Sequence, residues 1–328
     1  MVEGSRPTAR KPKIFAEQLG APEGPVVGPD GWLLNVCSFS PDDPDWPTRG
    51  GDIAATHWTM PRETHTVLNT SMSEVTGIPA ALAFGPDRCL YVTDEGRRSI
   101  VRITPTGEMD DFITKWQSEW INGPNDLCFD NEGNLFFTDP WTSSLENPIG
   151  AIYGYSWATG TLNKIRGGMA FPNGVAIRED RLYVAETYTR KVWVYEIEGP
   201  GLAGREAEFC TLPPVETSGL QGPDGMAFDQ EGNLFVAHLG SGCVQVYEPS
   251  GRLADSIPVG GIRPTNVCFG GPQLDVLCVT IDDLGTLVTL AAGTTGQRLN
   301  FCPSVIEDHP WSRVLKDSNR RAEESWYC

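Results

Sequence analysis

The chain has 328 residues, including 36 glycines and 26 prolines, and carries a formal net charge of -18 at pH 7. So acidic a chain lacks the basic surface that a nucleic-acid partner requires, and we expect no such partner. No apolar run approaches the roughly 18 residues that a membrane-spanning helix needs. Residues 1–12 contain no apolar stretch of the kind found in secretory signals, so they predict a flexible segment on a cytoplasmic protein with no membrane partner.

A short phrase that begins with proline returns along the chain, each time leading into a strand-like apolar run. The copies start at Pro22, Pro79, Pro124, Pro172, Pro223 and Pro264, at intervals of 41 to 57 residues. This interval is typical of a four-stranded propeller blade and not of a helical repeat. The sequence therefore predicts an all-β, six-bladed β-propeller over residues 13–302.

In chain order, residues 13–19 are the first expected strand, and we predict that they close the ring with the last blade. Their expected partners are strands at 276–280 and 286–290, with a further strand near 297–301. Residues 303–328 are charged and lack the repeat, so they are treated as a C-terminal tail.

Blade 1 is expected to contain strands near 31–38 and 57–60. Between them, residues 39–51 are too polar and proline-rich for a strand and form a candidate lid. In a propeller blade, the loop between the second and third strands lies on the same face as the start of the first. We therefore expect the loops and inter-blade connections of this face to supply substrate-binding residues, with these candidates: Trp46, Trp116, Trp120, Trp141, Tyr188 and His238.

The residue after each proline forms a column that a closed propeller directs toward its axis. Around the ring, this column reads Glu23, Ala80, Asn125, Asn173, Asp224 and Thr265. Two carboxylates and two amide oxygens would converge there, and confined carboxylates need a counter-charge. Oxygen ligands without His or Cys favour Ca²⁺, with Mg²⁺ and Mn²⁺ as competitors.

At blade spacing, these phrases resemble those of the senescence-marker-protein, gluconolactonase and luciferin-regenerating-enzyme family of six-bladed propellers. The resemblance covers nearly the whole chain, and its phrases are Pro22-Glu23-Gly24, Pro124-Asn125-Asp126, Pro172-Asn173-Gly174, Pro223-Asp224-Gly225 and Pro264-Thr265-Asn266. It implies a divalent metal on the axis, usually Ca²⁺ and sometimes Zn²⁺. The ligands implied are Glu23, Asn173 and Asp224, with Asn125 as a further ligand or a substrate contact.

The resemblance also implies a reaction, the hydrolytic opening of a lactone or a related ester, with a small molecule as substrate. The metal would polarise the carbonyl group while water attacks, and a carboxylate would accept a proton. Asp224 is the first candidate for this base and Asp126 the second. An aromatic lactone and a sugar lactone both stay open, as does the oligomeric state.

Two other classes of function fit the same residues. A non-hydrolytic enzyme of secondary metabolism, such as a cyclase, dehydratase or cycloaddition catalyst, would use the axial pocket without an attacking water. A propeller that only binds a partner would not need carboxylates and amides to converge on the axis. Use of water separates the first two classes, and dependence on metal separates both from the third.

Overall fold

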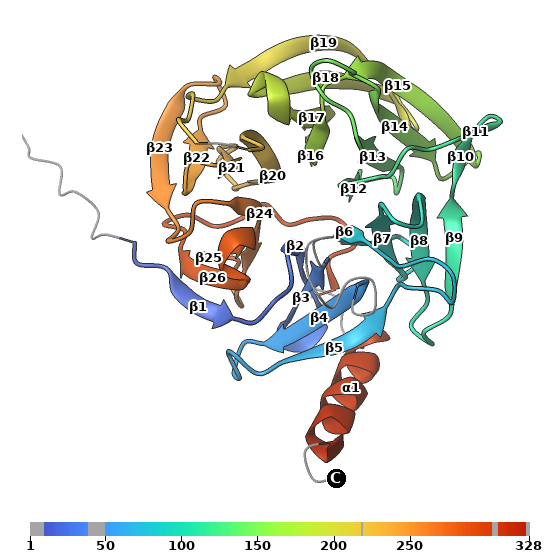
Figure 1. Ribbon diagram of the computed structural model, residues 1–328, viewed down its shortest axis with the longest axis vertical. Coiled ribbons are helices and arrows are strands. Elements are labelled where there is room, and N and C mark those ends of the chain that lie inside the picture. Colours follow the sequence, from blue (N-terminus) through green and yellow to red (C-terminus); the bar gives the residue numbers. More distant parts are fainter. Residues whose placement is uncertain (1–9, 39–49, 218, 304–307, 326–328) are drawn as a thin grey trace, which may run out of the picture.

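The structure is a computed structural model that describes residues 10–38, 50–217, 219–303 and 308–325. Six four-stranded antiparallel sheets are arranged as blades around a central axis (Figure 1). The innermost strand of each blade begins at or close to one of the repeated prolines. The predicted six-bladed, all-β propeller is therefore confirmed.

The first three blades follow the chain without a crossover. Blade 1 consists of β2 (Pro22–Val27), β3 (Trp32–Cys37), β4 (Asp52–His57) and β5 (Thr64–Asn69). Blade 2 consists of β6 (Pro79–Phe84), β7 (Leu90–Asp94), β8 (Ser99–Ile103) and β9 (Met109–Ile113). Blade 3 consists of β12 (Leu127–Phe129), β13 (Leu135–Asp139), β14 (Gly150–Ser156) and β15 (Thr161–Met169). A small hairpin precedes it, made of β10 (Lys115–Trp116) and β11 (Glu119–Trp120).

The last three blades continue the ring. Blade 4 consists of β16 (Pro172–Arg178), β17 (Arg181–Glu186), β18 (Lys191–Gly199) and β19 (Leu202–Thr211). Blade 5 consists of β20 (Gly222–Phe228), β21 (Leu234–Leu239), β22 (Cys243–Tyr247) and β23 (Leu253–Pro258). Blade 6 consists of β24 (Pro264–Gly270), β25 (Val276–Ile281), β26 (Thr286–Ala291) and β1 (Lys13–Ala16). Short 3-10 helices η1 (Pro29–Gly31), η2 (Thr187–Thr189) and η3 (Asp282–Leu284) lie in connections.

Strand β1 closes the ring as the outermost strand of blade 6. It pairs antiparallel with β26, with Lys13 opposite Thr289 and Ile14 opposite Val288. This confirms the predicted role of the N-terminal strand. The prediction of a further strand near 297–301 is wrong. Residues 297–301 form no strand, and β1 occupies the outer edge of β26.

Blade 1 also differs from the expectation. Its third strand is β4, which begins before the expected 57–60 segment and ends at His57. A turn follows, in which the backbone N–H of Met60 donates to His57 O at 2.9 Å. Pro61 has no N–H to donate to a ladder, which favours a turn over a strand here. Most of the candidate lid, residues 39–49 with Trp46, lies outside the described residues.

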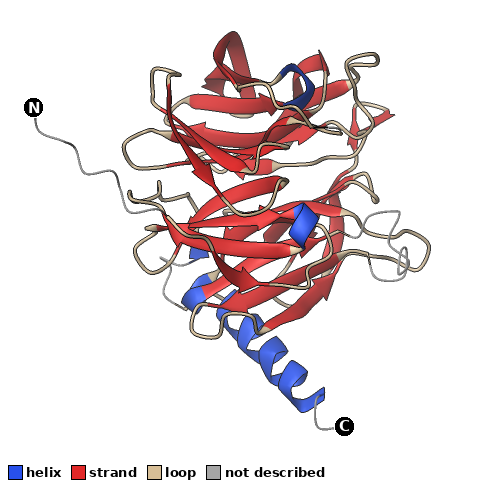
Figure 2. Ribbon diagram, turned by 60° about the vertical axis from the view of Figure 1, so that its left-hand side comes forward, coloured by secondary structure: helices blue, strands red, loops and turns tan. Residues whose placement is uncertain are grey.

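The C-terminal segment contains a helix where the sequence predicted only a tail. Helix α1 (Trp311–Ser325) projects from the blade 1 side of the ring (Figures 1 and 2). Trp311 and Leu315 are fully buried in a cluster with residues of blades 1 and 2, and Trp311 Nε1 donates to Arg88 O at 3.1 Å. The start of the helix thus shares a core with the propeller. Among the described residues, no helix is long and apolar enough to cross a lipid bilayer.

Candidate active site

The first residues of the inner strands surround the axis at one face of the propeller. In blade 4, Pro172 lies opposite Glu186, the last residue of the second strand, and in blade 5 Pro223 lies opposite His238. The loops after the second strands therefore lie on the same face as the residues that follow the prolines. We call this set the axial ring: Glu23, Ala80, Asn125, Asn173, Asp224 and Thr265.

Threonines in the second strands, or directly after them, fix the backbone around the axial ring. Thr93 donates its hydroxyl to Asn125 O of the next blade at 2.6 Å, and Thr138 donates to Asn173 O at 2.7 Å. Thr187 continues the pattern by donating to Pro223 O, beside Asp224, at 2.8 Å. Blades 2, 3 and 4 thus each hold the backbone of the next blade at the ring, so this part of the ring is preorganised by buried hydrogen bonds.

The side-chain nitrogens of the two asparagines in the ring donate hydrogen bonds to protein partners. Asn125 Nδ2 donates to Glu95 Oε1 at 3.1 Å, and Asn173 Nδ2 lies 3.1 Å from Thr187 Oγ1. Asn173 Oδ1 and Asp224 Oδ1 are buried and have no hydrogen-bond partner in the described part of the chain. Leaving such oxygens unpaired is costly, so this pair fits a bound cation.

The charges of the ring support the same fit. Burial raises the pKa of Asp224 well above its usual value, and the nearby charge of Asp126 adds to the effect. Burial also raises the pKa of Glu23, with the charge of Asp224 as the next largest cause. The Asp126 carboxyl has a pKa raised to about 7 by burial. Three buried carboxyl groups within electrostatic reach of one another would be stabilised by a divalent cation, and oxygen donors suit Ca²⁺.

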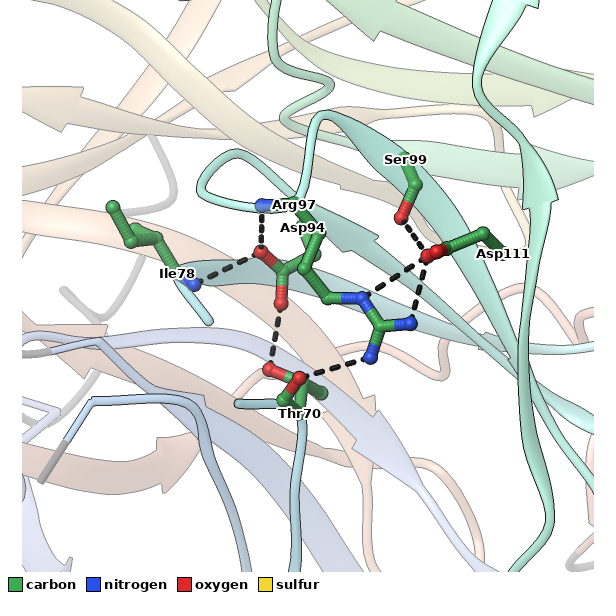
Figure 3. A network of polar contacts seen from close by, with 6 residues as sticks. All are labelled: Thr70, Ile78, Asp94, Arg97, Ser99 and Asp111. Atoms are coloured by element: carbon green, nitrogen blue, oxygen red, sulfur yellow. Dashed lines mark hydrogen bonds and ion pairs between the residues drawn. The ribbon is translucent and has the colours of Figure 1, made fainter. Parts of the chain in front are cut away.

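Buried acidic residues one step further from the axis have a structural role. At the end of β7, Asp94 accepts N–H bonds from Ile78 and Arg97, both at 2.9 Å, and the Thr70 hydroxyl at 2.6 Å (Figure 3). Asp139 and Glu186 occupy equivalent strand ends and also accept backbone N–H groups of the connection that precedes their blade. These carboxylates tie each connection to its blade and do not belong to the axial ring.

His238 occupies the equivalent position in blade 5. Its side chain is 1% exposed, and its Nδ1 lies 3.2 Å from Gln245 Nε2 on the neighbouring strand. Burial, assisted by the charge of Arg190, lowers its pKa to about 4. His238 is therefore a neutral buried residue, and its Nε2, like Asn173 Oδ1 and Asp224 Oδ1, has no hydrogen-bond partner in the described part of the chain. Its role in substrate binding stays a prediction.

The predicted aromatic residues separate into two groups. Trp116 and Trp120 belong to the hairpin β10–β11 at the outer edge of the ring, where Lys115 Nζ lies 4.5 Å from the Trp120 ring and Lys164 Nζ lies 5.1 Å from Trp116 (Figure 1). The structure does not bring these two to the axis. Trp141 and Tyr188, in contrast, follow second strands on the axial face.

Trp141 and Tyr188 pack against the segments that lead into the axial ring. The Trp141 ring packs against Gly123, two residues before Asn125. A Cβ atom added at Gly123 would lie only 2.9 Å from this ring. Tyr188 meets Phe171, two residues before Asn173, edge to face at 5.9 Å. Their exposed fractions are 37% for Trp141 and 38% for Tyr188, so both rings offer free aromatic surface.

Sequence reasoning missed several residues that support the site. Glu95, Thr187 and Asp282 directly follow second strands, and the first two hold the ring amides. Asp282 Oδ2 accepts from Arg263 Nε at 2.8 Å, and the charges of both residues act on Asp224. Reading the first residue after each second strand as a second column would have found Glu95, Thr187 and Asp282. No pattern in the sequence pointed to Phe171 or Arg263.

The fold and the oxygen-rich ring define a class, the six-bladed propellers with a polar centre on the axis. The chain belongs to the SMP-30/Gluconolactonase/LRE-like family, whose sequence profile matches residues 52–282. Diisopropyl-fluorophosphatase of Loligo vulgaris is 31% identical over 223 residues, which cover 62% of this chain and 68% of the relative. Gluconolactonase of Zymomonas mobilis subsp. mobilis is 31% identical over 202 residues, covering 57% and 56%.

A solved structure shows the same fold. The crystal structure of regucalcin, a calcium-binding protein from Agrobacterium tumefaciens, matches with a TM-score of 0.69 and 20% identity, over 91% of this chain and 97% of that one. A further sequence relative is named lactonase drp35, from Staphylococcus haemolyticus, and is 29% identical over 191 residues. The matches span 56% of the gluconolactonase and 68% of the phosphatase.

Proposed function

We propose that this protein is a divalent-metal-dependent hydrolase that opens a lactone ring. The observation that carries the proposal is the pair of buried oxygens without partners, Asn173 Oδ1 and Asp224 Oδ1, on the face where the carboxyl group of Glu23 also lies. Family membership supports the reaction class. Glu23, Asn125, Asn173 and Asp224 are the residues that would hold the metal, with Ca²⁺ as the proposed ion.

A bound divalent cation supplies Lewis acidity, which polarises a substrate carbonyl and offsets the negative charge that develops on it. The protein's own residues would orient the substrate and accept a proton from water. Both oxygens of Asp126 accept backbone N–H groups, from Leu127 at 2.8 Å and Val175 at 2.9 Å. Asp224 Oδ1 has no protein partner, so we propose Asp224 as the proton acceptor and Asp126 as the second candidate. Asp224 Oδ1 can accept a proton only while it does not bind the metal.

The mouth of the site favours a substrate with an aromatic or extended apolar part. Trp141, Phe171 and Tyr188 lie beside blades 3 and 4, and the cation Arg263 belongs to blade 6 on the other side of the axis. Aromatic surfaces bind apolar rings through burial and stacking. We therefore propose a lactone fused to, or substituted with, an aromatic group in preference to an unsubstituted sugar lactone.

The test combines metal analysis with hydrolysis. We expect one equivalent of Ca²⁺ per chain in purified protein, and ring opening of a benzo-fused lactone such as dihydrocoumarin in preference to δ-gluconolactone. Chelation should abolish hydrolysis, and readdition of Ca²⁺ should restore it. Asp224→Ala should lower kcat/KM by at least about a hundredfold, in line with the loss of one essential electrostatic group.

The matched control is Asp255→Ala, because Asp255 is an exposed carboxylate of blade 5 whose oxygens contact Arg10, at 3.4 Å, and the amide of Ser256. It should leave both metal content and hydrolysis unchanged. Protein without metal, or hydrolysis that survives chelation, would contradict the metal site. Stoichiometric metal without hydrolysis of any lactone would instead favour a non-hydrolytic reaction in the same pocket.

A further inference from the structure

A cavity lies on the propeller axis beyond the axial ring, and we call it the axial chamber. Its volume is about 140 Å³, and inner strands of all six blades line it. None of Glu23, Asn125, Asn173 and Asp224 is among its lining residues. Asp126 and Asn266 directly follow the ring residues Asn125 and Thr265 in the chain and line the chamber, so its polar end lies next to the axial ring.

The axial chamber exists because one ring of inner-strand side chains is small. The fourth residue after each repeated proline is Val26, Ala83, Cys128, Ala176, Ala227 or Cys268, and all six line the chamber. Five of these are partly exposed although they lie in the middle of inner strands, and Ala176 is 8% exposed. Protein interiors are normally close-packed, so a ring of small residues at this level leaves a void that larger side chains would fill.

The far end of the chamber is covered by the segment that follows blade 6. The N–H of Gln297 donates to Phe228 O at 2.8 Å, and its Nε2 donates to Ile177 O at 3.0 Å. Arg178 Nη1 donates to Gln297 Oε1 at 3.1 Å. These bonds tie the segment to blades 4 and 5, and the lining of the chamber also includes Leu299, Asn300, Cys302 and Pro303.

Most of the chamber wall is apolar, and the side-chain oxygens of Asp126 and Asn266 already have partners. Asp126 accepts two backbone N–H groups, and Asn266 Oδ1 accepts the N–H of Val267 at 2.7 Å. A buried water needs about two to four polar partners, whereas an engineered apolar cavity of about 150 Å³ stays dry and binds benzene. In its lining and its volume, the axial chamber resembles the apolar cavity that binds benzene.

We propose that the axial chamber is a binding site for a small neutral ring compound of about the size of benzene, separate from the axial ring. The ligand would lie among the six small side chains, with its edge toward Asp126. The apolar area that the ligand and the walls remove from water would supply the affinity.

Fluorobenzene is a suitable probe, because its ¹⁹F signal reports binding directly to the intact chain. We expect one saturable site in the wild-type protein. Ala227→Leu places a larger side chain in the chamber and should weaken binding at least about tenfold, which corresponds to about 1.4 kcal/mol. Ala207→Leu is the matched control, because Ala207 is exposed on β19, and it should bind as the wild type does.

A second variant, Ala83→Val, adds less volume from another blade and guards against misfolding of Ala227→Leu. It should also weaken binding while its circular dichroism spectrum stays that of the wild type. Absence of saturable binding in the wild type, or binding that both chamber variants leave unchanged, would overturn the proposal.

The chamber and the axial ring can be distinguished in the same experiment. Fluorobenzene should bind equally well after chelation and in Asp224→Ala, because neither change alters the chamber lining. Loss of binding under either condition would place the probe at the axial ring and overturn the separate site. Failure of lactone hydrolysis would leave the result on the chamber standing, so the two proposals are tested independently.

Discussion

His238 shows how one buried side chain links the fold to pH. Its folded-state pKa is lowered from 6.5 to about 4, chiefly because burial disfavours the charged ring. The unfolded chain takes up a proton near pH 6.5 and the folded chain does not, so this histidine's contribution to stability is complete above pH 6.5. It is lost as the pH falls from 6.5 toward 4, by at most about 1.4 kcal/mol per pH unit.

We therefore predict that His238→Asn flattens the acid side of the stability profile. The free energy of unfolding should be measured by urea titration between pH 7 and pH 4.5. Its slope against pH should be smaller in the variant, by at most the contribution of one proton, which is about 1.4 kcal/mol per pH unit. A variant profile parallel to that of the wild type would show that His238 takes up its proton equally in both states.

At the scale of single elements, buried carboxylates hold the connections between blades. Asp94 fixes the connection before blade 2 through Ile78 and Thr70 (Figure 3). Asp94→Ala removes the acceptor of the Ile78 and Arg97 N–H groups and leaves the Thr70 hydroxyl only Gly51 O, at 3.3 Å. We therefore expect the free energy of unfolding to fall by about 3 kcal/mol. Asp110→Ala is the control, because Asp110 is 55% exposed and 3.7 Å from Arg102, and it should cost less than about 0.5 kcal/mol. Equal effects in urea titrations would contradict the assigned role of Asp94.

Helix α1 depends on one large anchor. Trp311 is 0% exposed and meets Phe84 of blade 2 edge to face at 6.0 Å. Trp311→Ala should therefore lower the free energy of unfolding by about 3–5 kcal/mol, as expected for a cavity left by a buried aromatic ring. Arg313→Ala, on the same helix with 91% of its side chain exposed, should change stability by less than about 0.5 kcal/mol. If calorimetry finds the two variants equally stable, the helix is not docked through Trp311.

At the scale of the whole molecule, the ring is closed by one strand from the other end of the chain. Phe15 and Ala16 of β1 are 4% and 0% exposed, so the strand is held by packing as well as by its ladder with β26. Deleting residues 1–16 should remove about 3 kcal/mol through the loss of Phe15 alone and leave the edge of β26 unpaired. The deletion should lower the thermal midpoint and promote association, seen by calorimetry and light scattering.

Deleting residues 1–9 is the matched control for ring closure, because it leaves β1 intact. This shorter deletion should keep the thermal midpoint and the monomodal scattering of the full chain. A similar loss of stability in both deletions would mean that the pairing of β1 with β26 is not what closes the ring.

The sequence by itself determined the number of blades, the strand that closes the ring and the membership of the axial column. These follow from a local pattern that repeats at blade spacing, namely a proline, a polar residue and an apolar run. The pattern places Asn173 and Asp224 in equivalent positions before any contact is known. The fold class therefore needed no knowledge of which residues touch.

Only the tertiary structure decided which neighbours those residues have. Thr187 holds Asn173, and Trp311 enters the core between blades 1 and 2, through contacts between segments that the local pattern does not connect. The strand predicted near 297–301 was wrong for the same reason, because β1 occupies the outer edge of blade 6 beside β26. The axial chamber is likewise a product of six distant side chains, whose combined size becomes meaningful only once the ring is closed.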